Sequence, residues 1–106
     1  ANVQEVARGI GLDNRIGSKF LHAGPGYGGS CFPKDTLALI KTAQDHEAPV
    51  RIVETVAAVN DQRKRAMARK VVHACGGSVR GRTVAVLGLT FKPNTDDMRE
   101  APSVSI

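Results

Sequence analysis

One cysteine of this chain lies in a setting that suits a nucleophile. Cys31 follows a glycine-rich run at residues 24–29 and precedes Lys34 and Asp35, where a helix should begin. Glycines let a ligand approach the backbone closely, and a helix N-terminus and a lysine both favour negative charge on sulfur. Asp35 could act as a base or orient a water molecule. From these residues alone Cys31 could be a reactive nucleophile, a buried structural thiol or a metal ligand.

The second cysteine and two of the histidines indicate no comparable chemistry. Cys75 comes just before two glycines at the expected end of a long helix, which favours a small core residue. His46 and His73 have no partner at metal-ligand spacing, so we interpret both as surface or helix-end residues. Since no second Cys or His lies at ligand spacing from Cys31, we expect no metal site.

The charge balance favours anionic ligands without indicating nucleic-acid binding. Lys and Arg number 15 against 10 Asp and Glu in the 106 residues, so the summed field attracts nucleotides or phosphates. Much of the excess lies within residues 63–70, where a helix would spread it over several faces. We therefore expect a solvated or subunit-facing helix and no nucleic-acid partner.

The sequence carries no sign of export or of a membrane anchor. It has no signal peptide and no apolar run of ~18 residues, so we expect no membrane partner and a cytoplasmic location. The 2 cysteines lie in different settings and do not suggest a disulfide framework. The chain begins at Ala1 and not at Met, which suggests part of a longer protein.

The elements that position Cys31 begin with a short helix and a long loop. Residues 2–10 have the pattern of a helix that stops at Gly9 or Gly11, where glycine can adopt the left-handed conformation. The loop that follows, residues 12–35, is too long and irregular for an ordinary connection. Ordered loops of this length usually have a function, so we expect this one to build a site.

Two helices are expected after the loop. The first should begin near Asp35 or Thr36, with Asp35 accepting hydrogen bonds from free backbone amides and Pro33 just ahead, and run to about Glu47. The second is long: it should run from about residue 50 to residue 74 and end at Gly76-Gly77.

The long helix has a wider apolar arc than a surface helix needs. This arc predicts packing on more than one side, and a two-fold dimer contact would cover it. Asn60 and Lys64 interrupt the apolar face. Because buried polar groups need partners, we expect both to be bonded across a helix or subunit contact.

A second domain is expected to start after residue 78. Residues 83–89, TVAVLGL, form a β-branched and apolar run of the kind that makes a buried parallel strand. A loop follows, and Pro102 should lie in the first turn of another helix. The predicted organisation is a mostly α domain at residues 1–78 and the first strand-loop-helix of a Rossmann-like α/β domain at residues 79–106.

Three segments together resemble a known family. The segments GYGGSCFPKDTLAL, LGLTFKPNTDDMREAPS and DNRIGSKFL are similar to signatures of the UDP-glucose/GDP-mannose dehydrogenase family. The resemblance implies that residues 1–78 belong to a central helical domain whose long helix makes a homodimer, and that residues 79–106 begin a UDP-binding domain. It implies oxidation of UDP-glucose to UDP-glucuronate with two NAD+, through a thiohemiacetal and a thioester on the cysteine.

The same resemblance assigns roles to individual residues. It implies that Cys31 is the nucleophile and that Asp35 helps to activate the hydrolytic water. Arg15 would reach the substrate from the neighbouring subunit, and His22 stands where part of the family has a lysine. The expected cofactor contacts to NAD are Cys31, Lys34 and Arg99, and the expected substrate contacts are Arg15, Phe20, His22, Gly24, Tyr27, Gly28, Phe32, Phe91 and Lys92.

Other functions remain open at this point. A sister enzyme could oxidise another nucleotide sugar, such as GDP-mannose, by the same cysteine chemistry. A non-catalytic module could serve only to join two subunits, and a basic helical domain could bind nucleic acid. The family's GxGxxG loop and its upstream catalytic Lys and Asn have no counterpart in these 106 residues, so we expect activity only of a longer parent protein.

Overall fold

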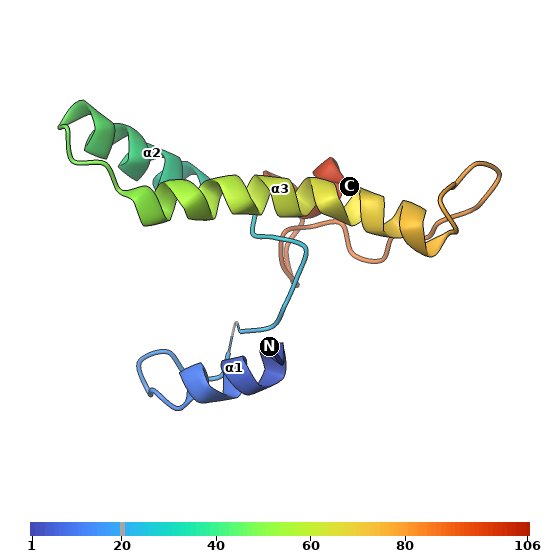
Figure 1. Ribbon diagram of the computed structural model, residues 1–106, viewed down its shortest axis with the longest axis horizontal. Coiled ribbons are helices and arrows are strands. Elements are labelled where there is room, and N and C mark those ends of the chain that lie inside the picture. The colour runs from blue at the N-terminus through green and yellow to red at the C-terminus, as the bar shows by residue number, and fades with distance from the viewer. Residues whose placement is uncertain (20) are drawn as a thin grey trace.

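The computed structural model describes residues 1–19 and 21–106, and its helices are α1 (Val3–Gly11), α2 (Phe32–Asp45), α3 (Arg51–Ala74) and α4 (Pro102–Ser105). The predicted substrate residue Phe20 lies outside the described residues. α2 and α3 lie side by side and are joined by a short turn, and α4 also packs against α3 (Figure 1). The long loop, residues 12–31, joins α1 to α2, and residues 75–101, the C-terminal segment, join α3 to α4.

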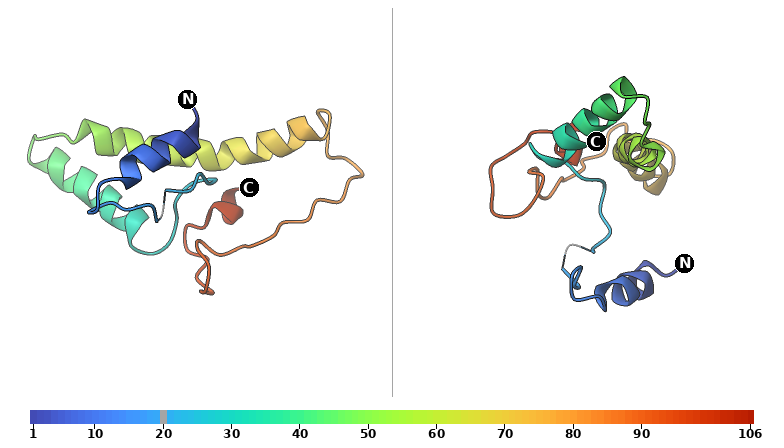
Figure 2. Two further views of the ribbon diagram at one scale, coloured as in Figure 1. Left: turned by 90° about the horizontal axis from the view of Figure 1, so that it is seen from below. Right: turned by 90° about the vertical axis from the view of Figure 1, so that its left-hand side faces the viewer.

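Helix α1 has the predicted bounds and stands apart from the other helices. The Asn2 side chain accepts a hydrogen bond from the Gln4 amide at 3.0 Å, which satisfies one free N–H at the helix start. The helix ends at Gly11, as expected, but the predicted left-handed glycine is wrong: neither Gly9 nor Gly11 has a positive φ, and the cap residue Leu12 keeps a right-handed φ of -68°. Both the view of Figure 1 and the right-hand view of Figure 2 show α1 separated from α2 and α3. Arg15 and His22 are therefore placed on a different part of the molecule from the cysteine loop.

Helix α2 begins at Phe32, earlier than predicted, and Cys31 is its N-cap residue. The expected capping role of Asp35 is wrong: Asp35 lies inside the first turn and bonds to Lys34. The earlier start has a physical cause, because Pro33 has no N–H to satisfy and its fixed φ suits a first turn. The thiol consequently lies directly at the N-terminus of the helix.

Helix α3 matches its prediction closely. It runs from Arg51 to Ala74 and ends where Gly76 and Gly77 take φ angles of 80° and 94°. The Gly77 amide donates to the Val72 carbonyl at 2.9 Å, which closes the last turn. Cys75 is the half-buried C-cap residue of this helix.

The predicted strand does not form. Residues 83–89 are exposed and carry no strand in the part of the chain that the structure describes. The reason is that a strand satisfies its backbone groups only by pairing with a neighbour, and no second strand is present among residues 1–19 and 21–106. The helix predicted after it does form, with Pro102 in its first turn, and the Ser103 hydroxyl bonds to the Leu89 carbonyl. The domain boundary at residues 78–79 stays a prediction.

Candidate active site

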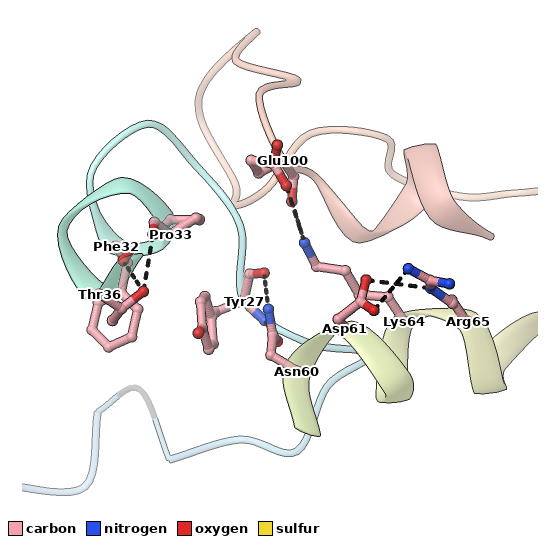
Figure 3. A network of polar contacts seen from close by, with 9 residues as sticks. All are labelled: Tyr27, Phe32, Pro33, Thr36, Asn60, Asp61, Lys64, Arg65 and Glu100. Atoms are coloured by element: carbon pink, nitrogen blue, oxygen red, sulfur yellow. Dashed lines mark hydrogen bonds and ion pairs between the residues drawn. The ribbon is translucent and has the colours of Figure 1, made fainter. Parts of the chain in front are cut away.

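The cysteine loop, residues 24–31, is anchored to the middle of α3 by side-chain bonds. The Asn60 amide accepts from the Tyr27 N–H at 2.8 Å and donates to the Tyr27 carbonyl at 3.1 Å (Figure 3). One turn further along, Arg63 Nε donates to the Gly24 carbonyl at 2.7 Å. A side chain that bonds both backbone groups of one residue fixes that residue's position strongly. The loop is thus attached to a rigid helix.

Lys64 anchors a second segment to the same helix. Its side chain is buried, and its ammonium donates to the Glu100 carbonyl at 2.9 Å and lies 3.8 Å from the Glu100 carboxylate (Figure 3). A buried ammonium needs such partners because its desolvation is otherwise costly. The expectation that Asn60 and Lys64 find partners is confirmed. The partners, however, are two loops of this chain and not another helix or subunit.

Two glycines allow these segments to touch. A Cβ at Gly28 would lie 2.2 Å from the Glu100 carbonyl oxygen, and a Cβ at Gly29 would lie 2.7 Å from the Phe91 ring. Gly29 also has a φ of 90° and donates its N–H to the Arg99 carbonyl at 2.8 Å. Any larger residue would push the C-terminal segment away from the cysteine loop. The motifs GYGGSCFPKDTLAL and LGLTFKPNTDDMREAPS therefore meet here in close contact.

A groove of about 520 Å³ opens at this junction, beside the N-terminus of α2. Cys31 is exposed, which rules out the buried structural role, and its Sγ lies 3.7 Å from the Ser30 hydroxyl. Two cationic side chains reach the groove from different motifs, Lys34 from α2 and Arg99 from the C-terminal segment. The groove is lined by Gly29, Ser30, Pro33, Lys34, Leu37, Arg99 and Glu100.

The first turn of α2 holds a close ion pair. Lys34 Nζ donates to the Asp35 carboxylate at 2.5 Å. This hydrogen bond, followed by the attraction of the Asp35 charge, raises the pKa of Lys34, and the neighbouring Cys31 sulfur adds a smaller effect in the same direction. Lys34 therefore stays positive over the whole neutral range. Asp35 is placed next to the groove, with its carboxylate oriented by Lys34.

The two arginines predicted to bind ligands are each held by the aspartate two positions earlier. Arg99 donates from Nε and Nη2 to the Asp97 carboxylate at 2.9 and 2.8 Å. These bonds, and then the charge of Asp97, raise the pKa of Arg99, and Arg99 lowers the pKa of Asp97. Arg15 and Asp13 form the same pair, with the pKa of Arg15 raised and that of Asp13 lowered by their side-chain bonds.

A second and larger cavity lies on the other side of the C-terminal segment. Its volume is about 610 Å³, and it brings Phe91 and Lys92 together with Pro25 and Gly26 of the cysteine loop. Lys92 Nζ lies 5.2 Å from the centre of the Phe91 ring, within range of a cation–π contact. Of the predicted substrate residues, Phe91 and Lys92 thus line this cavity, together with two other residues of the cysteine loop.

Other predicted site residues are dispersed. Tyr27 and Phe32 pack edge to face, with ring centres 4.7 Å apart, and so brace the loop against α2. Arg15 is an exposed residue of the turn after α1, and His22 lines a shallow pocket beside α1 with Gln4. Within this chain the structure does not bring Arg15 or His22 to the cysteine groove.

Sequence reasoning missed Arg63, which anchors the cysteine loop, and the two aspartates that hold the predicted ligand-binding arginines, Asp13 and Asp97. Arg63 belongs to the general charge excess of residues 63–70, and no local signal marks it as a loop anchor. The two aspartates do carry a signal, because the spacing Asp-x-Arg occurs in both Asp13-Asn14-Arg15 and Asp97-Met98-Arg99.

The described residues contain neither a metal-binding cluster nor a helix that could cross a membrane. Within residues 1–19 and 21–106, no three His, Cys, Asp or Glu side chains gather closely enough to hold a metal ion. None of the helices in this part of the chain combines the length and the apolar character that a membrane crossing requires.

Comparison with known proteins identifies relatives over the whole chain. The chain is 77% identical over 106 residues to a UDP-glucose 6-dehydrogenase of Rhizobium meliloti strain 1021 and spans 24% of that protein. It is 53% identical over 106 residues to a UDP-glucose 6-dehydrogenase of Bacillus subtilis, again spanning 24% of the relative. A solved UDP-glucose dehydrogenase from Pyrobaculum islandicum superimposes with a TM-score of 0.79 at 46% identity, over 94% of this chain and 23% of the other.

Family models match both parts of the chain. Residues 1–62 match the central domain of the UDP-glucose/GDP-mannose dehydrogenase family, and residues 85–106 match the UDP-binding domain of the same family. The central-domain match includes the cysteine loop and its anchor Asn60, while the second match includes Phe91, Lys92 and Arg99. The sequence motifs, the groove that they form and these matches agree: the chain belongs to the UDP-glucose/GDP-mannose dehydrogenase family.

Proposed function

We propose that the full-length protein carrying this chain is an NAD-dependent UDP-glucose 6-dehydrogenase that forms UDP-glucuronate. The observation that carries the proposal is the exposed Cys31 at the N-terminus of α2. Its neighbour Ser30 lines a groove that Lys34 and Arg99 enter from two separate motifs. The 77% identity to a UDP-glucose 6-dehydrogenase supports the choice of substrate. We further propose the cytoplasm as its location, since both cysteines are free thiols.

Cys31 supplies the covalent step. After the C6 alcohol has been oxidised to an aldehyde, the thiolate adds to the aldehyde carbon and forms a C–S bond, giving a thiohemiacetal. Loss of the C6 hydride and of the hydroxyl proton converts this adduct into a thioester. Water then adds to the thioester carbon and the C–S bond breaks. This step releases UDP-glucuronate as a carboxylate and regenerates the Cys31 thiolate. The helix N-terminus favours the anionic sulfur in both the attacking and the leaving step.

The groove suits the cofactor by its charge and shape. NAD, when bound, accepts one hydride in each of the two oxidations. Lys34 and Arg99 are the residues that would face its pyrophosphate, because two cations beside a helix N-terminus are a favourable anion site. Asp35, oriented by Lys34, is the residue that would orient the hydrolytic water.

The larger cavity is the proposed place of the sugar nucleotide. Phe91 and Lys92 line it opposite the cysteine loop, and Lys92 supplies a positive charge for a diphosphate or a polar sugar group. The cysteine loop lines it with Pro25 and Gly26. Gly24 and Tyr27 would act indirectly, by fixing the loop to α3 through their backbone bonds, with Phe32 bracing the loop. His22 lines a separate pocket beside α1 and is not proposed to line this cavity.

The substrate assignment is tested by activity of the full-length protein with different sugar nucleotides. UDP-glucose is expected to give two NADH per sugar oxidised, and GDP-mannose is expected to react at least about a hundredfold more slowly, because a site that rejects a base or a hydroxyl discriminates by several kcal/mol. NADH absorbance together with product chromatography provides the measurement. Preference for GDP-mannose would show that the protein is a GDP-mannose dehydrogenase instead. If neither sugar nucleotide gave NADH, the alternative of a non-catalytic module that joins two subunits would remain.

We also propose that α3 joins two copies of the protein and that Arg15 serves the partner's site. Ile52, Val56 and Val59 on α3 are 81%, 44% and 52% exposed, an apolar surface that a second copy would cover. Arg15 lies away from its own cysteine groove, as a residue that acts across a dimer would.

Mixed dimers test this arrangement. Arg15→Ala and Cys31→Ser subunits, each poorly active alone, should regain activity when co-expressed, since one site of the mixed dimer then has both residues intact. Rates at low UDP-glucose concentration, compared with those of each parent, give the result. If the mixture stays as inactive as its parents while sedimentation detects dimers, Arg15 acts within its own subunit.

A further inference from the structure

Two arginines from distant parts of the chain are held in the same local structure. The Asp13 carboxylate accepts from the Arg15 backbone N–H at 2.9 Å, from Nε at 3.0 Å and from Nη2 at 2.6 Å. The Asp97 carboxylate accepts from the Arg99 backbone N–H at 2.9 Å, from Nε at 2.9 Å and from Nη2 at 2.8 Å. Each aspartate therefore binds both the backbone and one edge of the guanidinium group.

In each pair the aspartate is the fixed member. The Asp97 side chain is 14% exposed against 71% for Arg99, and the Asp97 amide donates to the Thr95 hydroxyl at 3.1 Å. The Asp13 side chain is 35% exposed against 89% for Arg15, and the Asp13 carbonyl accepts from the Gly17 amide at 2.8 Å. The arginine side chains are thus held in a defined direction while their outer atoms stay in solvent.

Such exposed pairs add little to the stability of the fold, because water screens them. They do affect binding. A free arginine side chain loses conformational entropy at several rotatable bonds when it binds an anion. An aspartate that already holds the side chain in place removes much of this entropy cost of binding. Since the described bonds use Nε and Nη2, the Nη1 donors remain available for a ligand.

We propose that Asp13 and Asp97 are positioning residues for two different ligands: Asp97 orients Arg99 toward the pyrophosphate of the cofactor, and Asp13 orients Arg15 toward the sugar nucleotide. The proposal rests on the function proposed above. The two pairs lie on separate parts of the molecule, so each aspartate controls the affinity for one ligand only.

The test is steady-state kinetics of the full-length enzyme with Asp97→Asn and Asp13→Asn. Asparagine keeps the size of the side chain but loses the charge that holds the guanidinium. Asp97→Asn should raise KM for NAD about tenfold and leave KM for UDP-glucose unchanged, and Asp13→Asn should do the reverse. Asp45→Asn, which breaks the comparable 2.6 Å ion pair with Lys41 on α2, is the matched control and should change neither constant.

Two outcomes would overturn the proposal. If either aspartate variant raises both KM values and lowers the melting temperature, the pair is structural; if neither KM changes, the pair has no role in binding. Arg99→Ala separates this failure from failure of the proposed function: an unchanged KM for NAD in Arg99→Ala refutes the assignment of Arg99 itself. Where Arg99→Ala does weaken NAD, adding Asp97→Asn should weaken it no further, because one residue acts through the other.

Discussion

Cys31→Ser in the full-length protein is expected to lower the rate of UDP-glucuronate formation by more than about a thousandfold, as removal of a covalent nucleophile generally does. A serine hydroxyl is almost wholly un-ionised near neutral pH, so the helix N-terminus and Lys34 have no anion to stabilise. An oxygen ester would also release its acyl group less readily than a thioester. NADH formation under steady-state conditions provides the measurement.

Binding separates this loss from damage to the fold. Because the groove is lined by residues other than Cys31, among them Lys34 and Arg99, Cys31→Ser should retain near-normal dissociation constants for UDP-glucose and NAD. Cys75→Ser is the matched control: Cys75 is the half-buried C-cap residue of α3, and its replacement should leave the rate almost unchanged. Near-normal turnover by Cys31→Ser would remove the covalent mechanism.

Gly28→Ala is expected to have the next largest effect, about a hundredfold loss in kcat, although it adds a single methyl group. That methyl would lie 2.2 Å from the Glu100 carbonyl oxygen, so the cysteine loop and the C-terminal segment must move apart. A displacement of about 1 Å between reacting groups can cost a hundredfold in rate. Overpacking of this kind also destabilises a fold by about 1–3 kcal/mol, so thermal unfolding should be measured with the kinetics.

The control for this substitution is Gly9→Ala. Gly9 lies inside α1 with no neighbour within 4 Å of an added Cβ, and alanine is the better helix former. Its kinetics should stay unchanged and its stability should rise slightly. If Gly28→Ala proved as harmless as Gly9→Ala, the contact between the cysteine loop and Glu100 would not be needed for the active arrangement.

The helices were predictable from the sequence because their signals are local. The paired glycines after residue 74 end α3, and the apolar spacing gives its length. The predicted start of α2 is wrong because Asp35 resembles a cap residue, whereas Pro33 fits the first turn and the helix begins at Phe32. Residues 83–89 have the composition of a strand, but pairing depends on neighbouring strands, which a local pattern does not contain.

The content of the site was more predictable than its geometry. The glycines around Cys31 indicate a ligand-binding loop. Asn60 and Lys64 interrupt the apolar face of the long helix, which indicates that both make buried hydrogen bonds. Their partners, Tyr27 and Glu100, lie far away in sequence, so only the fold reveals them. The Asp-x-Arg spacing of Asp97 and Arg99 is present in the sequence. It does not by itself indicate a functional ion pair, because two opposite charges close in sequence usually form a solvated surface pair.

The measurement that tests the central claim most directly is thiol alkylation of the full-length enzyme, with the labelled cysteine identified by peptide mass spectrometry and activity followed in parallel. Cys31 is expected to react with iodoacetamide before Cys75, the loss of turnover should follow the labelling of Cys31 one for one, and bound UDP-glucose should slow both. Activity that persists after Cys31 is fully labelled, or that falls only as Cys75 reacts, would contradict the assignment of Cys31 as the nucleophile.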